Sequence, residues 1–337
     1  MATQEKGTSA YSNAMSMVEH YRKQLDDLSG GLNLEVKDGL AFSSLLDDRV
    51  AVLAYFEAAR LASISHADTA KGVISEQERY KSVDVRQKLS GGLEQHLVNL
   101  RNRRSLALTE DNDKEFAAKI LTWFHKFESD LKELMEDAST KLEFDSDRLK
   151  FTIAQTGKVP YTFQTLSSGY LAIFDIYADL LMRTEYFKVL PEELVGLVFI
   201  DELDAHLHVS LQRLILPFLT RSFPLVQFVV TTHSPFVIMS VDDAVIFDIG
   251  RNQQVDEDLS LYSYSAVMEG VLGTRTTSKL LDEIISRIAS IVNSGDVNSE
   301  ELSGLLEKIR PVEGKLDSQS RAFYMKGMNA LLDEGEV

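Results

Sequence analysis

The alternation of apolar and polar positions divides the chain into segments of different type. Continuous apolar runs rich in β-branched and aromatic residues predict buried strands at residues 50–56 (VAVLAYF), 195–200 (VGLVFI) and 226–231 (VQFVVT), with one more at 244–248. Amphipathic helices are predicted at 168–187 and 209–221. Buried strands that alternate with helices predict an α/β fold with a parallel, doubly wound sheet.

Residues 76–138 have a different character, because they are polar, highly charged and free of proline. Apolar side chains recur there at spacings of three and four, namely Phe116, Ile120, Phe124, Phe127, Leu131 and Leu134. Such a stripe requires a partner helix, for which we expect residues 85–108, so the segment predicts a helical hairpin. Residues 141–153 alternate apolar and polar positions around Asp145-Ser146-Asp147 and predict a β-hairpin.

The two ends of the chain are predicted to be helical. Residues 11–28 carry an apolar helical face that ends at Ser29-Gly30-Gly31, and residues 265–337 form a polar helical tail. We therefore expect four segments. They are residues 1–75, the remainder of an N-terminal lobe; 76–140, a helical insertion; 141–250, the lobe that carries the motifs described below; and 251–337, a helical C-terminal region.

Composition narrows the classes of function. The chain has 337 residues with 35 Lys and Arg, 52 Asp and Glu, a net charge of −17 and no cysteine. So acidic a chain does not coat nucleic acid with its whole surface. The lack of cysteine excludes disulfides, a Cys nucleophile and thiolate metal sites. No apolar run is long enough to cross a bilayer and the first residues lack a signal-peptide pattern, so we expect a cytoplasmic protein without a membrane partner.

Two adjacent carboxylates follow one of the predicted strands. Asp201 and Glu202 come directly after residues 195–200. In an open α/β sheet, ligands bind beyond the carboxyl ends of the strands. A carboxylate at that edge can hold Mg²⁺ against nucleotide phosphates, and its neighbour can polarise the attacking water. The structural alternative is that Asp201 caps the next helix and Glu202 is solvated.

Two further motifs point to the same edge. The strand at 226–231 leads into Thr232-His233-Ser234-Pro235, and three of the seven histidines gather near these strand ends: His206, His208 and His233. Upstream, Ser167, Ser168 and Gly169 stand directly before a long predicted helix. Backbone N–H groups and hydroxyls at a helix N-terminus can bind an anion, although a plain serine cap would give the same pattern.

In this order and spacing, the motifs resemble those of ABC-type ATPases of the AAA-like, SMC-related branch, most specifically within residues 160–240. The short insertion is closer to the compact ATPases of bacterial anti-phage systems, such as the Septu, retron-associated and overcoming-lysogenisation-defect families. This resemblance implies a P-loop NTPase-like ABC ATPase sheet with a helical insertion, a helical C-terminal tail and an incomplete N-terminal lobe.

The resemblance also implies a role for each motif. LSSGY (166–170) is similar to the signature motif, in which Ser167, Ser168 and Gly169 would bind the nucleotide held by the opposite subunit. VGLVFIDE is similar to Walker B, with Asp201 as the Mg²⁺ ligand and Glu202 as the catalytic base.

The remaining motifs complete this set. TTHSP is similar to the switch region and assigns a catalytic role to His233. The D-loop region would contain Asp204, His206 and His208, where many relatives carry Asp at the last position. The implied cofactors are ATP and Mg²⁺. The implied partners are a second copy of the chain or a higher oligomer, a nuclease, and DNA or RNA.

One expected motif is missing. A P-loop requires G-x-x-x-x-G-K-[ST], and no segment of the sequence matches it. We therefore expect an N-terminally shortened, split or degenerate member that grips ATP weakly by itself. Leu89-Ser90-Gly91-Gly92 spells a commoner form of the signature, but it precedes no Walker B strand at a workable distance and is interpreted as a helix stop and turn.

Three alternatives stay open at this point. The fold could persist as a non-catalytic interaction module that has lost its P-loop. Carboxylates and histidines at the strand ends could form a divalent-metal-dependent hydrolase without nucleotide. An ATPase of this branch could also serve DNA repair or chromosome maintenance rather than phage defence.

Overall fold

The computed structural model describes residues 39–60, 64–67, 69, 87–294 and 298–335. The helix predicted at 11–28 and the turn after it lie outside these residues. The first part contains α2 (Gly39–Asp47), β1 (Ala51–Phe56), η1 (Ser90–Gly92), α4 (Leu93–Thr109), α5 (Lys114–Leu134), β2 (Lys141–Asp145), β3 (Lys150–Ala154) and η2 (Phe163–Thr165). Next come α6 (Ser168–Phe187), η3 (Pro191–Glu193), β4 (Val195–Ile200), α7 (Val209–Ser222), β5 (Val226–Val230) and α8 (Pro235–Ile238). The last elements are β6 (Ile246–Asp248), β7 (Gln253–Val255), η4 (Leu259–Leu261), α9 (Tyr264–Gly270), α10 (Lys279–Ser294), α11 (Ser299–Ile309), η5 (Arg310–Lys315) and α12 (Ser318–Gly335).

A parallel sheet with the strand order β1-β4-β5 forms the centre of the α/β body. Its strands coincide closely with the apolar runs predicted from sequence. Gly196 of β4 lies opposite Val52 of β1 and has a φ of +156°. A Cβ at Gly196 would stand 2.1 Å from the Val52 carbonyl oxygen, so only glycine permits this close pairing.

The strand predicted at 244–248 is present, but it does not join the parallel sheet. β6 pairs antiparallel with β7 as a separate two-stranded sheet. The chain reverses between them, where Asp248 Oδ1 accepts a hydrogen bond of 3.1 Å from the Arg251 backbone N–H. The expectation of another parallel strand was therefore wrong, because a local turn supplies β6 with a nearer partner.

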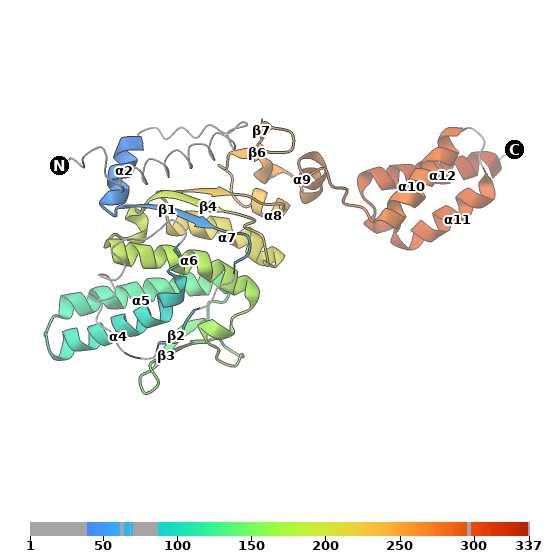
Figure 1. Cartoon of the computed structure of the whole chain (residues 1–337). Coiled ribbons are helices and arrows are strands. Elements are labelled where there is room, and N and C mark those ends of the chain that lie inside the picture. Colours follow the sequence, from blue (N-terminus) through green and yellow to red (C-terminus); the bar gives the residue numbers. More distant parts are fainter. Residues whose placement is uncertain (1–38, 61–63, 68, 70–86, 295–297, 336–337) are drawn as a thin grey trace, which may run out of the picture.

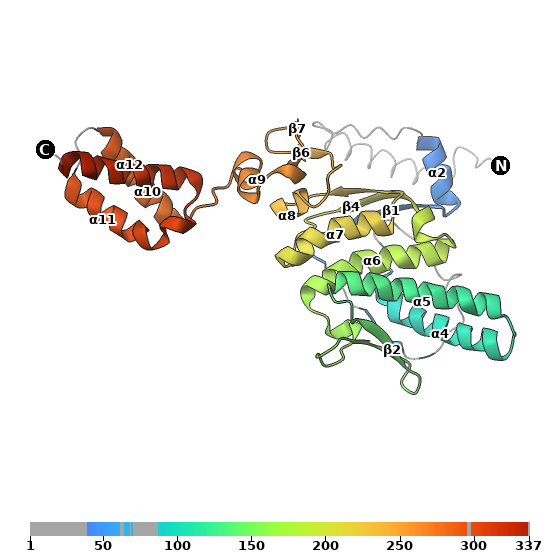
Figure 2. The same cartoon turned by 180° about the vertical axis from the view of Figure 1, so that it is seen from behind.

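Helix α6 forms the middle layer of the body. The helices α6 and α7 lie on one face of the sheet, and the α4–α5 hairpin lies on the far side of α6 (Figures 1 and 2). Tyr177 of α6 is fully buried and stacks on Phe127 of α5, with ring centroids 6.3 Å apart. The predicted apolar stripe of α5 is buried from Ile120 to Leu134, while Phe116 remains half-buried. The helical hairpin and the β2–β3 hairpin are both confirmed.

The glycine turn at residues 89–92 starts a helix rather than ending one. Ser90–Gly92 form the 3₁₀ turn that leads into α4. The turn is fixed to α6, because Ser90 Oγ donates to Asp175 at 2.7 Å and the Leu89 N–H donates to Asp179 at 2.6 Å. Ser90 is buried, so its hydroxyl serves this contact with α6 and does not face solvent.

The C-terminal helices have an apolar core of their own. The helices α10, α11 and α12 surround a cluster made of Ile285, Ile288, Ile291, Leu302, Leu306, Ile309 and Tyr324. No buried residue of this cluster belongs to the main core, and the bundle lies beyond α9 (Figure 1). The prediction of a helical tail is confirmed, while the four-segment division stays a prediction. None of the described helices is both long and apolar enough to span a bilayer.

Candidate functional site

The acidic pair follows β4 at the edge where the strands end. The Asp201 N–H donates to the Phe56 carbonyl at 2.9 Å, which continues the pairing with β1. From the β5 side, Thr231 Oγ1 donates to Asp201 Oδ1 at 2.6 Å and accepts from the Glu202 N–H at 2.8 Å. One threonine therefore orients the first carboxylate and the backbone of the second. Asp201 is half-buried, and Glu202 is exposed with a left-handed φ of +45°.

A buried arginine binds the backbone of this turn. Arg60, which follows β1, is 6% exposed. Its guanidinium donates to the backbone carbonyls of Asp201 at 2.9 Å, Glu202 at 2.7 Å and Leu203 at 3.1 Å. Burial lowers the pKa of Arg60, while the carboxylate of Asp175 and those of the acidic turn oppose that shift. Arg60 thus holds the turn in its left-handed conformation through three carbonyls.

The end of β5 is connected to the same turn through Asp204. Its Oδ1 accepts hydrogen bonds from the Thr232 hydroxyl and, at 3.3 Å, from the His233 backbone N–H. Ser234 caps α8 by accepting from Phe236 N–H at 3.1 Å, and its hydroxyl donates to Gln212 of α7 at 2.7 Å. These contacts leave the His233 side chain exposed at the strand end.

A cavity of about 460 Å³ brings these predicted residues together. Asp201, Glu202 and His233 all line it, as do Thr231 and Thr232. Its other wall is apolar and is formed by Val230, Val237, Ile238, Val241, Val245, Ile246, Phe247 and Ile249. The cavity therefore joins a polar edge, made of strand ends, to an apolar wall.

The start of α6 packs beside this turn but does not line the cavity. Gly169 is buried, and a Cβ there would lie 3.1 Å from the His206 carbonyl oxygen, so the helix approaches that backbone closely. Ser167 occupies the N-cap position without a side-chain capping bond, and both Ser167 and Ser168 are exposed. Neither serine lines the cavity of the acidic pair. Within one chain, the signature-like serines and the carboxylates therefore do not meet.

The histidines divide between different tasks. His208 stands at the N-cap of α7, where its Nδ1 accepts from the Ser210 N–H at 3.5 Å. His206 has a φ of +65° and an exposed side chain. Neither lines the cavity with His233. Among the described residues, no three His, Asp or Glu side chains gather in a way that could hold a metal ion.

The donor set fits one Mg²⁺ ion that is shared with a nucleotide. Asp201 Oδ1 is occupied by the Thr231 hydroxyl, and no hydrogen bond to Oδ2 is found in the described part of the chain. Mg²⁺ prefers hard oxygen ligands and is commonly held by one or two carboxylates together with phosphates and water. A single free carboxylate oxygen suits such an ion and is too little for a site made of protein ligands alone.

Sequence reasoning missed two residues that shape the site. Arg60 stands four positions beyond one predicted strand and Thr231 is the last residue of another, where arginine and threonine are ordinary surface residues. Their roles depend on the order β1-β4-β5, which places both strands beside β4. The available signal was an arginine that follows an apolar strand so closely, VAVLAYFEAAR.

Comparison with known families agrees with this geometry. Residues 32–240 match the model described as "AAA domain, putative AbiEii toxin, Type IV TA system". The chain belongs to this AAA-domain family. The matched residues contain β1, β4 and β5 together with all the motifs at their ends.

Two curated relatives show what this AAA domain is similar to. Over 105 residues it is 36% identical to the "Retron Ec83 probable ATPase" of Escherichia coli, a match that covers 30% of this chain and 19% of the relative. Over 162 residues it is 28% identical to the "Septu protein PtuA" of Bacillus mycoides (strain KBAB4), covering 44% of this chain and 23% of the relative. The matches thus span less than a quarter of these relatives' length.

Among solved structures, one match comes from work on ATP-driven dimerisation and DNA-stimulated activation of SMC ATPases. It has 16% sequence identity and a TM-score of 0.31, and it covers 44% of this chain and 90% of that chain.

Proposed function

We propose that this AAA domain supplies the acidic, signature and histidine parts of an ATP-hydrolysing site in a subunit that associates on ATP and acts with a partner. The observation that carries the proposal is the shared cavity at the ends of β4 and β5, which Asp201, Glu202 and His233 all line. Ligands of open α/β sheets bind at this edge. Membership of an AAA-domain family supports a nucleotide as the ligand.

Each residue at this edge then has a distinct task. Asp201 would hold Mg²⁺, which neutralises phosphate charge, through the carboxylate oxygen that Thr231 leaves free. Glu202 would take a proton from the attacking water, since its exposed carboxylate reaches the cavity. His233 would contact the terminal phosphate from the end of β5.

The start of α6 would complete the site of a second copy. Ser167, Ser168 and Gly169 do not line the cavity of their own chain, and their N–H groups and hydroxyls would instead bind a phosphate held by another subunit. Asp204 and His206 would transmit the contact, because Asp204 bonds to the His233 backbone and His206 lies against Gly169. His208 contributes by capping α7.

The motifs of this sequence do not include a P-loop, the segment that binds the α and β phosphates of a nucleotide. We propose that a Walker A segment, in the same protein or in a partner, supplies this binding. The similarity to retron and Septu proteins supports a role in bacterial phage defence beside a nuclease or a protein that acts on DNA or RNA. DNA repair or chromosome maintenance is the competing role.

Binding of Mn²⁺ measured by electron paramagnetic resonance tests this proposal. The protein should be purified together with the products of its neighbouring genes, so that a Walker A segment encoded there is present. We expect Mn²⁺ to bind only with ATP, and Asp201→Asn to abolish that signal. The matched control Asp256→Asn changes an exposed carboxylate outside the cavity and should leave the signal intact.

The same measurement separates the alternatives. Mn²⁺ that binds without ATP and depends on Asp201 would favour a metal-dependent hydrolase. No binding of Mn²⁺ or ATP under any condition would favour the non-catalytic interaction module. Either result would overturn the proposed function.

A further inference from the structure

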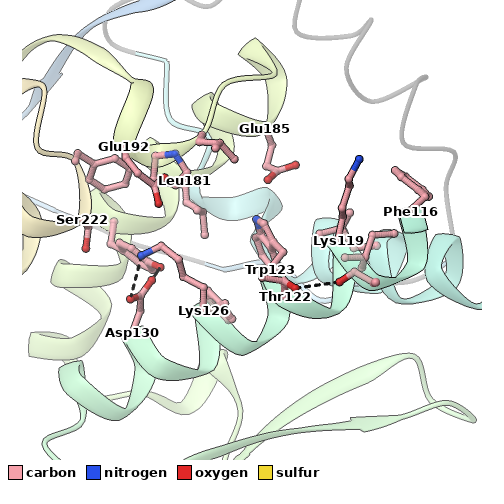
Figure 3. Close-up of a pocket in the computed structure, with 18 of the residues that line it drawn as sticks. Phe116, Lys119, Thr122, Trp123, Lys126, Asp130, Leu181, Glu185, Glu192 and Ser222 are labelled. Carbon is pink, nitrogen blue, oxygen red and sulfur yellow. Dashed lines mark hydrogen bonds and ion pairs between the residues drawn. The ribbon is translucent and has the colours of Figure 1, made fainter. Parts of the chain in front are cut away.

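A second and larger cavity lies away from the strand ends, between α5, the C-terminal half of α6 and the η3 turn (Figure 3). Its volume is about 750 Å³. Its surface is mainly apolar and aromatic, from Phe116, Ile120, Trp123, Phe127, Tyr177, Leu181, Leu190 and Phe223. None of the residues that line the cavity of the acidic pair lines this one.

The cavity has the shape of a groove along α5. Lining residues of α5 run from Glu115 to Asp130, which corresponds to roughly 22 Å along a helix axis that rises about 1.5 Å per residue. The facing wall follows α6 at four-residue spacing through Tyr177, Leu181 and Glu185. The lining thus covers about four turns of α5 and about two turns of α6, and an elongated groove of this kind matches another helix better than it matches a compact small molecule.

The charges on the two walls differ. On α5, Lys119 pairs with Glu115 at 2.9 Å, and Lys126 lies 3.9 Å from Asp130. These lysines are therefore already matched by carboxylates of their own helix. On the opposite wall stand two carboxylates, those of Glu185 and Glu192. Glu185 pairs with His96 at 3.5 Å, whereas no ion pair of Glu192 is found in the described part of the chain. The exposed Glu192 thus offers a carboxylate on this wall to a cation of an incoming segment.

The apolar floor of the groove has features of a binding surface. Trp123 stacks on Phe127 with ring centroids 5.5 Å apart, and it is half-buried rather than covered. Leu190 is 58% exposed at the lip. Figure 3 shows Trp123, Leu181 and Glu185 directed toward the same space. Tryptophan residues that line a partly open apolar pocket are typical anchors of protein interfaces.

We propose that this groove binds an amphipathic helix of a partner protein, whose apolar residues at i, i+3, i+4 and i+7 enter the groove and whose Lys or Arg residues face Glu192. The inference deepens the proposed action with a partner and rests on it. Because α6 carries the signature-like serines at its N-terminus and this groove at its other end, partner binding and nucleotide binding would share one helix.

The sequence provides a specific reporter, since Trp123 is the only tryptophan in the chain. The probes are synthetic helical peptides of about 16 residues, long enough to follow the four turns of the groove. One has a leucine face flanked by lysines, a second has the same face flanked by glutamates, and a third is a scrambled form of the first. No nucleotide is added, so failure here is distinct from failure of the ATP-binding proposal.

We expect the basic peptide to shift Trp123 emission and to bind at least about tenfold more tightly than the acidic or the scrambled peptide. Equal binding of the basic and scrambled peptides would overturn the proposal, because it would reflect only attraction to an acidic protein. A shift of Trp123 emission with protein concentration alone would assign the groove to a second copy of the chain and would also overturn it.

Two pairs of variants locate the binding site. Leu190→Asp should weaken binding of the basic peptide about tenfold, even though it adds negative charge. Leu261→Asp changes an 83% exposed leucine outside the groove and should leave that binding unchanged. Glu192→Lys should improve binding of the acidic peptide, and Glu307→Lys in α11 should leave it unchanged. Members of a pair that behave alike would contradict the proposed site.

Discussion

At the scale of single residues, the site depends on side chains that hold the backbone as much as on those that face the cavity. Thr231 and Arg60 together bind one carboxylate oxygen, one N–H and three carbonyls of the acidic turn. The sequence indicated Asp201 and Glu202, because adjacent carboxylates after an apolar run are conspicuous. It could not indicate their supports, whose role arises only when distant strands pair.

Arg60→Lys tests this support. An ammonium group is a compact donor on a different stem and cannot reproduce the planar fork that reaches three carbonyls. We expect ATP turnover to fall about tenfold in kcat with little change in KM, and stability to fall by roughly 2 kcal/mol as bonds from a charged donor are lost. Steady-state kinetics and urea unfolding measure these effects, with the exposed Arg310→Lys as control. Loss of stability with kcat unchanged would limit Arg60 to a structural role.

Asp130 provides a prediction about pH. Burial raises the pKa of its carboxyl above the ordinary value of 3.8, although Tyr177 donates to it at 2.6 Å. The folded state therefore retains the proton to higher pH than the unfolded state, so this group's contribution to stability falls as pH rises through the folded pKa. We expect Asp130→Asn, which keeps an acceptor for Tyr177, to gain stability relative to the native protein as pH rises. Urea unfolding at several pH values measures the stability difference between each variant and the native protein, with Asp256→Asn as control. A difference for Asp130→Asn that stays as constant with pH as the difference for Asp256→Asn would contradict this prediction.

At the scale of elements, the apolar patterns predicted most of the fold. The runs at 50–56, 195–200 and 226–231 became β1, β4 and β5 because a buried parallel strand is apolar on both faces. The pattern at 244–248 misled because periodicity identifies a strand but not its partner. The glycine turn at residues 89–92 misled because its attachment to α6 depends on Asp175 and Asp179, which are far away in sequence.

Ser167→Arg tests the element that starts at the signature-like motif. The native side chain makes no cap bond, so its replacement costs the isolated chain little. An arginine there opposes the positive end of the helix dipole and fills the space that a phosphate would enter. We expect ATP-dependent association, measured by light scattering, to be lost while nucleotide binding to one subunit persists. Ser318→Arg, at the first residue of α12, is the matched control. Association of both variants with ATP would show that residues 166–170 are not the signature.

At the scale of the whole molecule, the two apolar clusters predict two folding units. The C-terminal bundle has its own core, and residues 271–278 before it are without helix or strand. Arg275 in that stretch is exposed. We expect brief trypsin digestion to cut after Arg275 and to leave a helical fragment from residue 276 onward that circular dichroism detects. A fragment that is degraded as fast as it forms would show that the bundle depends on the AAA domain.

The central claim is that the edge formed by β4 and β5 hydrolyses ATP, and ATP turnover by Glu202→Gln tests it most directly. The amide keeps the size of the carboxylate but cannot take a proton from water. In the protein purified with its neighbouring gene products, we predict a loss of turnover of about 100-fold or more, with ATP still bound and the ATP-bound dimer accumulating. The exposed Glu307→Gln should turn over ATP normally. A Glu202→Gln variant that hydrolyses ATP at the native rate would contradict the account.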